Sequence, residues 1–458
     1  MIADLKPYPA YRESGLPWIG KVPEHWKSER AKWLFAKMAR PVREEDEIVT
    51  CFRDGTVTLR KNRRLRGYTE ATVENGYQGI RKGDLVIHGM DAFAGAIGVS
   101  DSDGKGTPVY NVCQPNEGVN AQYYAHLIRV MSQSQWILAL AKGIRERSTD
   151  FRFETFGNQR VAFPPLEEQV AIVRFLDWAN GQLEKAIRAK RKVITLLDEQ
   201  KQAIIHRAVT RGLDPSVPLK PSGISWLGDI PGHWEILRAK FLFRAITRRD
   251  AKMSDPKLSV TQARGVVRTD EMSEHSNQAR SIENFQTCEL GDLVVNKYKA
   301  HLGVFWSAPL RGVITPNYSI FVPFRETDAR YFELLLHTKV YRSYFLRTVQ
   351  GVTLGMSPLY NGDFLATPMP RPPYREQSAI IEGVRALTAD VDVALSRFER
   401  EIELLREYRT RLVADVVTGK LDVREAAAKL SDEALIDLPD NDSVETLEYE
   451  PFEDEAFV

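Results

Sequence analysis

A run of basic residues in the first third of the chain is the strongest candidate for chemistry. Residues 60–66 read Arg60-Lys61-Asn62-Arg63-Arg64-Leu65-Arg66. Lysine and arginine side chains neutralise phosphates, and one arginine can donate two hydrogen bonds to a single guanine. A charge run is also typical of an ordinary solvated face, so this motif alone leaves both interpretations open.

No pattern of catalytic or metal-ligating residues accompanies these cations. The sequence has no GxGxxG motif after a strand, no Walker A loop, no GxSxG and no HExxH. Its three cysteines, Cys51, Cys113 and Cys288, form no CxxC pair, which fits a reducing cytoplasm and argues against a structural zinc site. His25 and His233 each precede a tryptophan, and we expect them to be structural. We therefore expect no catalytic, cofactor or metal site on this chain.

One internal repeat, at an offset of 208 residues, organises the chain. The matching pairs include Trp18 and Trp226, His25 and His233, Trp26 and Trp234, Asp84 and Asp292, Pro165 and Pro373, Glu168 and Glu376, Gln169 and Gln377, and Asp214 and Asp422. A period this long indicates duplicated domains and not a solenoid of small repeats. The segments between these motifs differ in sequence, which favours a protein that reads two different things.

Each half of the chain is expected to contain two kinds of structure. Short apolar stretches between glycine and aspartate residues, as over 46–115, predict strands, and the following region, 121–142, has a helical period. Residues 30–37 predict a short helix. Residues 166–211 contain no proline, and their stripe of apolar or small residues predicts one helix of 46 residues, about 69 Å long. That stripe comprises Ile172, Leu176, Ala179, Leu183, Ala186, Val193, Leu197 and Ile204.

A second stripe follows the second Pro-Pro pair and predicts a second long helix. It comprises Ile380, Val384, Leu387, Val391, Ala394, Phe398, Ile402, Leu405, Tyr408, Leu412 and Val416. Both stripes need a partner, and antiparallel pairing of the two helices within the chain is the expected solution; packing on the helix's own domain or on another protein is the alternative. We predict an α+β fold with two globular domains separated by two antiparallel coiled-coil helices. The predicted boundaries are 1–163, 164–215 (helix), 216–371, 372–425 (helix) and an acidic tail, 426–458, expected to be disordered.

The net charge of +1 hides a strong asymmetry. Residues 431–458 hold eleven acidic residues and no lysine or arginine, and without them 63 basic residues face 51 acidic ones, a net charge of +12. A basic body with an acidic tail is common in proteins that handle nucleic acid, and a merely soluble body with a disordered end is the alternative. No segment approaches the run of about 18 apolar residues that spans a membrane, so we expect a cytoplasmic protein.

The basic and polar residues of the two middle segments are the candidate DNA contacts, because most of them lie where the two halves differ. They are Arg53, Arg60, Lys61, Arg63, Arg64, Arg66, Arg145, Arg147, Arg248, Arg249, Lys252, Gln262, Arg264, Arg268, Lys297 and Lys299. The sequence does not separate residues that read bases from residues that are merely basic.

The whole plan resembles the specificity subunit of type I restriction-modification systems. The resemblance rests on the doubled order of three motifs, found at the two domain openings, at the helix starts and at the helix ends. They are Trp18-Ile19-Gly20 to His25-Trp26 and Trp226-Leu227-Gly228 to His233-Trp234, then Pro164-Pro165-Leu166-Glu167-Glu168-Gln169 and Pro372-Pro373-Tyr374-Arg375-Glu376-Gln377, and finally Thr210-Arg211-Gly212-Leu213-Asp214 and Thr418-Gly419-Lys420-Leu421-Asp422. The matched motifs extend from about residue 13 to 425, and the acidic tail lies outside them.

The resemblance implies a non-catalytic, DNA-binding subunit with two target-recognition domains. Each domain would read one half of a bipartite asymmetric site in double-stranded DNA, and the helices would set the spacer and dock two methyltransferase subunits. Motor and nuclease restriction subunits would join them, and S-adenosylmethionine, ATP and Mg²⁺ would bind those partners and not this chain. Two alternatives remain. One is an enzyme with its catalytic part on this chain, which the missing motifs disfavour; the other is a protein-assembly scaffold that does not read DNA.

Overall fold

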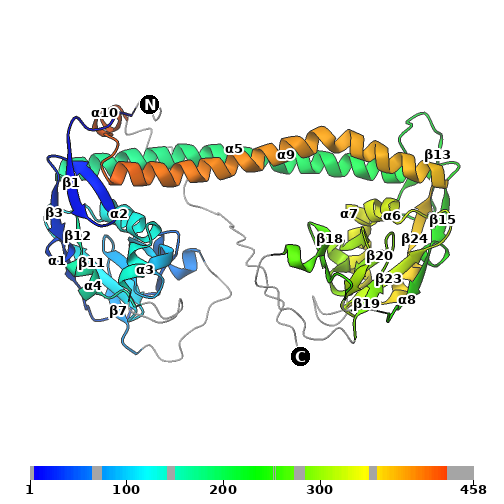
Figure 1. Cartoon of the computed structure of the whole chain (residues 1–458), viewed down its shortest axis with the longest axis horizontal. Helices are drawn as coiled ribbons and strands as arrows, with labels where there is room; N and C mark the ends of the chain where they lie inside the picture. Colours follow the sequence, from blue (N-terminus) through cyan, green and yellow to red (C-terminus); the bar gives the residue numbers. More distant parts are fainter. Residues whose placement is uncertain are drawn as a thin grey trace. The chain divides into compact units, whose positions relative to one another are not determined.

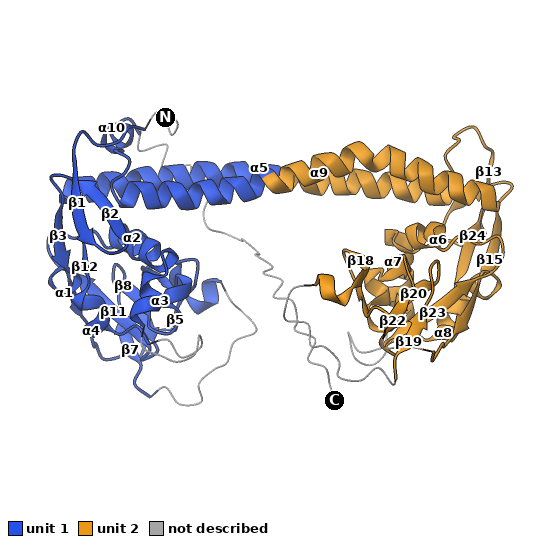
Figure 2. Ribbon diagram, in the orientation of Figure 1, with its two compact units in different colours: residues 1–190, 401–458 blue, residues 191–400 orange. Residues whose placement is uncertain are grey.

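The computed structural model describes residues 5–63, 75–141, 150–250, 252, 254–272, 284–349 and 358–430. The chain divides into two compact units: unit 1 is Met1–Lys190 with Glu401–Val458, and unit 2 is Arg191–Arg400 (Figure 2). Each unit has a globular α+β part and a share of two long helices, α5 (Leu166–Arg211) and α9 (Tyr374–Val417) (Figure 1). Among the described residues, no helix is both long enough and apolar enough to cross a lipid bilayer.

The core of unit 1 is a four-stranded antiparallel sheet. Its strand order is β4 (Phe35–Lys37), β11 (Tyr110–Pro115), β8 (Leu85–His88) and β9 (Ile97–Val99). Leu85, Val86 and Ile87 are all buried, because β8 lies inside the sheet and is covered on both faces. The turn at Gly83-Asp84 leads directly into this strand, and Gly83 has a φ of +91°, which glycine adopts most readily.

Helix α2 (Ala121–Gln133) packs against this sheet. Its buried face includes Tyr123, Leu127, Ile128 and Met131, which follow the three- and four-residue spacing of one helix face. The Asn120 side chain caps the first turn by accepting a hydrogen bond from the Tyr123 backbone N–H at 3.1 Å. The helical region predicted over 121–142 is thus confirmed to residue 133. A second short helix, α3 (Trp136–Leu140), then follows a break.

Pairs of short antiparallel strands complete unit 1. They are β1 (Tyr11–Leu16) with β2 (Ile19–Pro23), β3 (Lys27–Arg30) with β12 (Arg160–Phe163), β5 (Val49–Cys51) with β6 (Val57–Leu59), and β7 (Gln78–Ile80) with β10 (Gly104–Gly106). Two helices, α1 (Ala31–Leu34) and α4 (Phe153–Asn158), pack together beside them. The helix that we predicted over 30–37 is therefore wrong beyond Leu34, because residues 35–37 pair with β11 as strand β4.

Unit 2 repeats this plan. Its four-stranded sheet has the order β16 (Phe243–Ile246), β23 (Tyr318–Pro323), β20 (Leu293–Asn296) and β21 (Phe305–Ser307). Its strand pairs are β13 (Leu219–Pro221) with β14 (Asp229–Pro231), β15 (Glu235–Arg238) with β24 (Pro368–Arg371), β17 (Leu258–Thr261) with β18 (Gly265–Arg268), and β19 (Gln286–Cys288) with β22 (Gly312–Ile314). Its helices are α6 (Ala329–Leu336), α7 (Lys339–Thr348) and α8 (Asn361–Ala366).

The offset of 208 residues holds through most of the two folded middles. Leu85 pairs with Cys113 and Val99 in unit 1, and Leu293 pairs with Phe321 and Ser307 in unit 2. The two middles thus keep one topology and one register although their sequences differ. The ribbons β5–β6 and β17–β18 are an exception, because their tips differ in length.

The long helix predicted over 166–211 is confirmed with these bounds. Pro164 and Pro165 precede α5, and Gly212, with a φ of +75°, follows its last residue. The helix α9 likewise follows Pro372 and Pro373 and runs for 44 residues. Local sequence signals were therefore sufficient to place both ends of α5 and the start of α9 to within two residues.

The two helices pair in antiparallel fashion within each unit, as predicted. In unit 1, Lys190 Nζ lies 2.5 Å from Glu401 Oε2, and Arg409 Nη1 lies 3.5 Å from Glu184 Oε2. In unit 2, Lys201 Nζ lies 2.5 Å from Asp392 Oδ1. As the residue number rises along α5, the residue number of the partner on α9 falls, so the two helices are antiparallel.

The predicted apolar stripes are wrong at three positions. Val193 is 37% exposed, Leu387 is 57% exposed and Tyr408 is 43% exposed. The stripe on α5 advances by four residues twice in succession, from Ala179 to Leu183 and on to Ile187, which is buried. Two consecutive four-residue steps rotate the seam relative to a regular heptad, so Val193 falls outside it.

The chain closes on itself at unit 1. Lys6 forms a β-bridge with Asp422, and Arg424 Nη1 lies 3.3 Å from Glu168 Oε1. A short helix, α10 (Arg424–Ala428), follows α9 there. Lys6 and Asp422 both stand 208 residues from Asp214. Asp214 lies in the covalent link from α5 to β13, so the bridge between Lys6 and Asp422 takes the place of that link in unit 1.

Candidate nucleic-acid interface

The repeated His-Trp and Glu-Gln motifs meet at the start of each long helix. In unit 1, the buried Glu168 carboxylate accepts a hydrogen bond from Trp26 Nε1 at 2.7 Å and lies 2.6 Å from His25 Nε2. In unit 2, Trp234 Nε1 donates to Glu376 at 3.0 Å, and His233 Nε2 lies 2.7 Å from the same carboxylate. These contacts join each long helix to its globular part, so both histidines have a structural environment.

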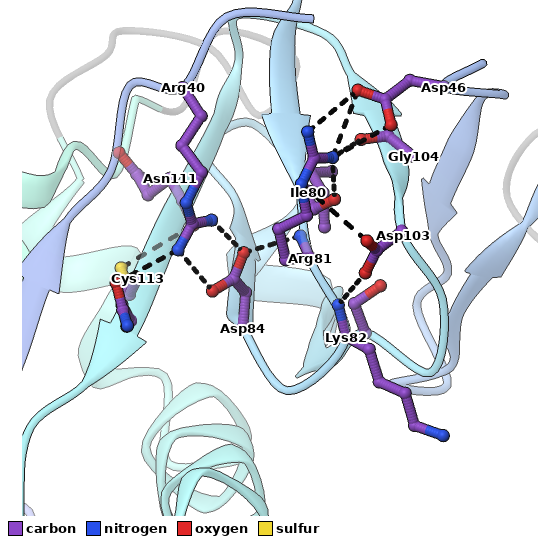
Figure 3. A network of polar contacts seen from close by, with 12 residues as sticks. Arg40, Asp46, Ile80, Arg81, Lys82, Asp84, Asp103, Gly104, Asn111 and Cys113 are labelled. Carbon is purple, nitrogen blue, oxygen red and sulfur yellow. Dashed lines mark hydrogen bonds and ion pairs between the residues drawn. The ribbon is translucent and has the colours of Figure 1, made fainter. Parts of the chain in front are cut away.

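The Gly-Asp turns organise a second pair of equivalent networks. In unit 1, Asp84 accepts a hydrogen bond from the Arg81 backbone N–H at 2.7 Å and receives the Arg40 guanidinium (Figure 3). Arg81 in turn binds the buried Asp46 at 3.0 Å. This network connects the segment before β5 to the turn before β8, and so supports the strand pair β5–β6.

Arg248, one of the candidate DNA contacts, is the counterpart of Arg40. Its guanidinium binds the buried carboxylate of Asp292, which also accepts the Glu289 backbone N–H at 2.7 Å. The hydrogen bond to Asp292 raises the pKa of Arg248 above its ordinary value. Breaking a pair with a buried carboxylate is costly, so this geometry favours a structural role for Arg248.

The strand pair β5–β6, here called ribbon 1, carries several of the predicted cations. Cys51 pairs with Val57, so residues 52–56 form its tip. Arg53 Nη2 lies 3.0 Å from Asp91, in the turn between β8 and β9, and its side chain is 69% exposed. Arg63 Nη2 lies 2.6 Å from Asp54. The tip region therefore brings together two cations, Arg53 and Arg63, each with an acidic partner.

These ion pairs are accessible to a competing anion. The Arg63 guanidinium lies over the Phe52 ring at 4.6 Å, and Lys61 Nζ lies 2.5 Å from Glu47 in an exposed pair. Burial acts to raise the pKa of Asp54, but hydrogen bonds from Arg63 and Thr56 outweigh it and leave the pKa below its ordinary value. Exposed pairs contribute about 0–1 kcal/mol, so a phosphate can replace these carboxylates at little cost.

The strand pair β17–β18, here called ribbon 2, is built differently at its tip. Thr261 pairs with Gly265, so only residues 262–264 form the tip. Gln262 and Arg264 are exposed there, and Arg268, at the end of β18, forms an exposed ion pair with Asp270 at 2.8 Å. An amide and a guanidinium at a short tip are the groups that read adenine and guanine edges.

The remaining predicted residues have varied surroundings. Lys297 and Lys299 lie in the 3₁₀ segment η7 (Lys297–Leu302), where Lys297 Nζ donates to the Pro316 carbonyl at 2.9 Å and Lys299 is exposed. Arg60 Nε donates to Thr50 Oγ1 at 3.4 Å, whereas Arg249 and Lys252 are exposed. Arg64, Arg66, Arg145 and Arg147 lie outside the described residues.

Sequence reasoning missed two residues near these candidates. Tyr298 is 44% exposed between Lys297 and Lys299, and its aromatic ring next to two cations was a readable signal for base or sugar contact. Arg129 lies on α2 behind ribbon 1, and no sequence signal marked it, because it stands among the apolar residues of a buried helix.

Within the described ranges, no cluster of three or more metal-ligating side chains occurs. The three cysteines are buried and form no disulfide. What the described residues present in each unit is a strand pair that is largely buried along its strands, carries exposed polar residues at its tip and is flanked by lysine and arginine side chains. Such an arrangement can bind a polyanion through its flanks and contact bases through its tip.

The chain was compared with protein-family models and with solved structures. No protein-family model matches the chain. Among solved structures, it is similar to a chain from "Structural basis underlying complex assembly and conformational transition of the type I R-M system", at 14% identity and a TM-score of 0.59. The match covers 86% of this chain and 98% of that chain.

Two further solved structures are also similar at low identity. They are the HsdS subunit from Thermoanaerobacter tengcongensis, at 15% identity and a TM-score of 0.41 over 87% of this chain and 98% of that chain, and the S subunit of a type I restriction-modification system from M. genitalium, at 13% and 0.34 over 86% and 96%. The neighbours thus come from type I restriction-modification systems, the family that the sequence motifs resemble. The likeness to the first structure shows a shared fold.

Proposed function

We propose that this chain is the DNA-specificity subunit of a type I restriction-modification complex. The observation that carries the proposal is the doubling: one topology occurs twice, and the copies differ in the tips of the equivalent ribbons 1 and 2. A protein with one target sequence read symmetrically would need identical tips. Two unlike tips on one scaffold suit an asymmetric site with two different halves.

A two-stranded ribbon is a shape that the major groove of DNA accommodates. In this proposal the tip residues Arg53, Gln262 and Arg264 approach base edges, while Lys61, Lys297 and Lys299 neutralise phosphates beside them. Apart from Arg248, the remaining candidates from the sequence, including Arg64, Arg66, Arg145 and Arg147, stay predictions of the same kind.

The long helices would fix the spacing between the two half-sites. Half-sites read from one face of the duplex lie about 34 Å apart or a multiple of it. A helix of the length of α5, 46 residues, extends over about 69 Å, which is long enough to act as a ruler on that scale.

The same helices offer a surface to the partner subunits. In unit 1, a groove on the helix pair is lined by Lys190, Leu404, Leu405, Tyr408 and Arg411. Leu404 is 47% exposed and Tyr408 is 43% exposed, and apolar side chains open to solvent are typical of protein-binding surfaces. We propose that two methyltransferase subunits dock on the helices and that restriction subunits join them. S-adenosylmethionine, ATP and Mg²⁺ would bind those partners, and this chain would be non-catalytic.

An assembly scaffold that does not read DNA is the second candidate. It is favoured by one observation, namely that many candidate cations already have carboxylate partners, as with Arg63 and Asp54 or Arg268 and Asp270. Such pairs can hold a charged surface in solution without any nucleic acid.

Selection from randomised DNA duplexes separates the two functions. The chain, purified with its methyltransferase subunits, is incubated with the duplex pool, and bound sequences are determined. The proposal predicts two enriched blocks of bases separated by a fixed number of unselected base pairs. A pool without enrichment, or with a single palindromic block, would contradict it and favour the scaffold.

A further inference from the structure

The two ribbons rest on equivalent strands that carry very different residues. Ribbon 1 lies against β9, where Gly98 leaves no room for a side chain. An ideal Cβ at Gly98 would overlap the Gly55 carbonyl oxygen and would lie 2.9 Å from Val57 Cγ2. The backbone of ribbon 1 therefore sits directly on the sheet.

Position 306 is the counterpart of Gly98 and is occupied by tryptophan. Trp306 lies on β21, under ribbon 2, and an ideal Cβ at Gly265 would lie 3.1 Å from Cε3 of its indole ring. Gly265 has a φ of +76°, which any other residue adopts only with strain. In unit 1 the ribbon backbone packs directly on β9, whereas in unit 2 the indole ring of Trp306 lies between β21 and the ribbon backbone.

A second position changes together with the first. Arg129 supports ribbon 1 from α2, and an ideal Cβ on Gly55 would lie 2.6 Å from its Nη1 atom. The counterpart of Arg129 is His337, whose ring centroid lies 4.4 Å from that of Trp306. Unit 1 combines a glycine with a long cationic side chain, and unit 2 combines an indole with a smaller ring. Each pair fills the space beneath its own ribbon.

Stabilising contacts alone do not explain the side chains of Arg129, Trp306 and His337 beneath the ribbons. The atoms Arg129 Nε, Trp306 Nε1 and His337 Nε2 are buried and have no hydrogen-bond partner among the described residues. Burial lowers the pKa of the Arg129 guanidinium and lowers that of His337 to about 4. Buried polar atoms without partners reduce stability, and their occurrence under both ribbons suggests that position, and not stability, determines these residues.

We propose that the pairs Gly98–Arg129 and Trp306–His337 are specificity-determining positioning residues, which set the height and angle of each ribbon tip over its sheet. This inference rests on the proposed reading of DNA. The tip side chains, such as Arg53 in unit 1 and Arg264 in unit 2, then reach different base pairs because their ribbons pack on different residues of the underlying sheet. The two pairs act through the ribbons, without contacting bases themselves.

Trp306→Ala tests the proposal directly. Removal of the indole lets ribbon 2 settle toward β21, so base preference should change by about tenfold at one or more positions of one half-site. The other half-site, read by unit 1, should stay unchanged in the same selection experiment. The salt dependence of binding should also stay unchanged, because the phosphate-contacting cations remain.

Trp226→Phe provides the matched control. Trp226 packs on Tyr341 and Tyr344 of α7 in the same unit, with ring centroids 5.1 and 4.9 Å away. It should leave both half-sites as they are. If Trp306→Ala leaves every base preference unchanged, or weakens both half-sites equally, the proposal is overturned.

A second variant keeps the test decisive if Trp306→Ala does not fold. Gly98→Ala must lift ribbon 1, since its Cβ would otherwise overlap Gly55, and it should alter only the half-site that Trp306→Ala leaves unchanged. An unchanged preference in folded Gly98→Ala protein overturns the proposal. If the wild-type protein itself selects no sequence, the proposed function fails first, and the positioning role fails with it.

Discussion

At the scale of single residues, the structure separates two classes of charged side chain that look alike in sequence. Arg40 and Arg248 bind the buried carboxylates of Asp84 and Asp292, and both pairs recur at the offset of 208 residues. Arg53 and Arg264 lie instead at exposed ribbon tips. Sequence reasoning included Arg248 among the candidate DNA contacts because a basic residue carries no sign of its partner, and the partner lies 44 residues away.

His126 gives a prediction at this scale. It lies on α2, and burial, followed by the neighbouring Arg129, lowers its pKa to about 4. The folded pKa is below the ordinary value of 6.5, so stability is present above pH 6.5 and is lost as the pH falls toward 4. Its counterpart in unit 2 is Leu334, which does not titrate.

We therefore expect His126→Leu to reduce the acid sensitivity of the protein. Between pH 7.5 and 5, the wild type should lose about 2 kcal/mol more unfolding free energy than the variant. Chemical denaturation of both proteins at the two pH values measures this difference. Equal losses in the two proteins would show that His126 is not held neutral in the fold.

At the scale of elements, the sequence predicted most of what local signals control. The bounds of α5 follow from the Pro-Pro pair and from Gly212, and the turn at Gly83 follows from its Gly-Asp motif. The predicted apolar stripe of α5 was wrong at Val193, because the rotation of the stripe depends on packing against the partner helix. The supports of the ribbons were not predicted at all, since Gly98 and Arg129 approach Gly55 only in the folded state.

The helices give a prediction at the scale of elements. Deleting residues 194–200 from α5 and 393–399 from α9 removes one heptad from each helix and keeps the ion pairs Lys190–Glu401 and Lys201–Asp392. Seven residues correspond to about 10.5 Å of helix, or about three base pairs.

The enriched site of this deletion variant should have a spacer shorter by about three base pairs, with both half-sites unaltered. Selection from randomised duplexes reads the spacer directly. A matched variant that replaces Val193 and Leu196, both exposed on α5, with alanine should leave the spacer unchanged. An unaltered spacer in the deletion variant would exclude the helices as the ruler.

At the scale of the whole molecule, the repeat is the central fact. The four-stranded sheets of the two units share one strand order and one register, and Lys6 forms a β-bridge with Asp422. The doubled order of motifs allowed the fold to be predicted from sequence. These motifs could not identify the bases that are read, because base contacts depend on how each ribbon packs on its sheet and on side chains whose partners the sequence does not show.

Methylation-sensitive sequencing of the host genome, with and without the gene for this chain, decides whether the chain determines DNA specificity. If it does, a bipartite, asymmetric adenine-methylation motif is present in the wild type and disappears on deletion of the gene. The motif should return when the gene is restored, and with Trp306→Ala it should return altered in one half only. An identical methylation pattern with and without the gene, in cells that express active methyltransferase subunits, would contradict a specificity role.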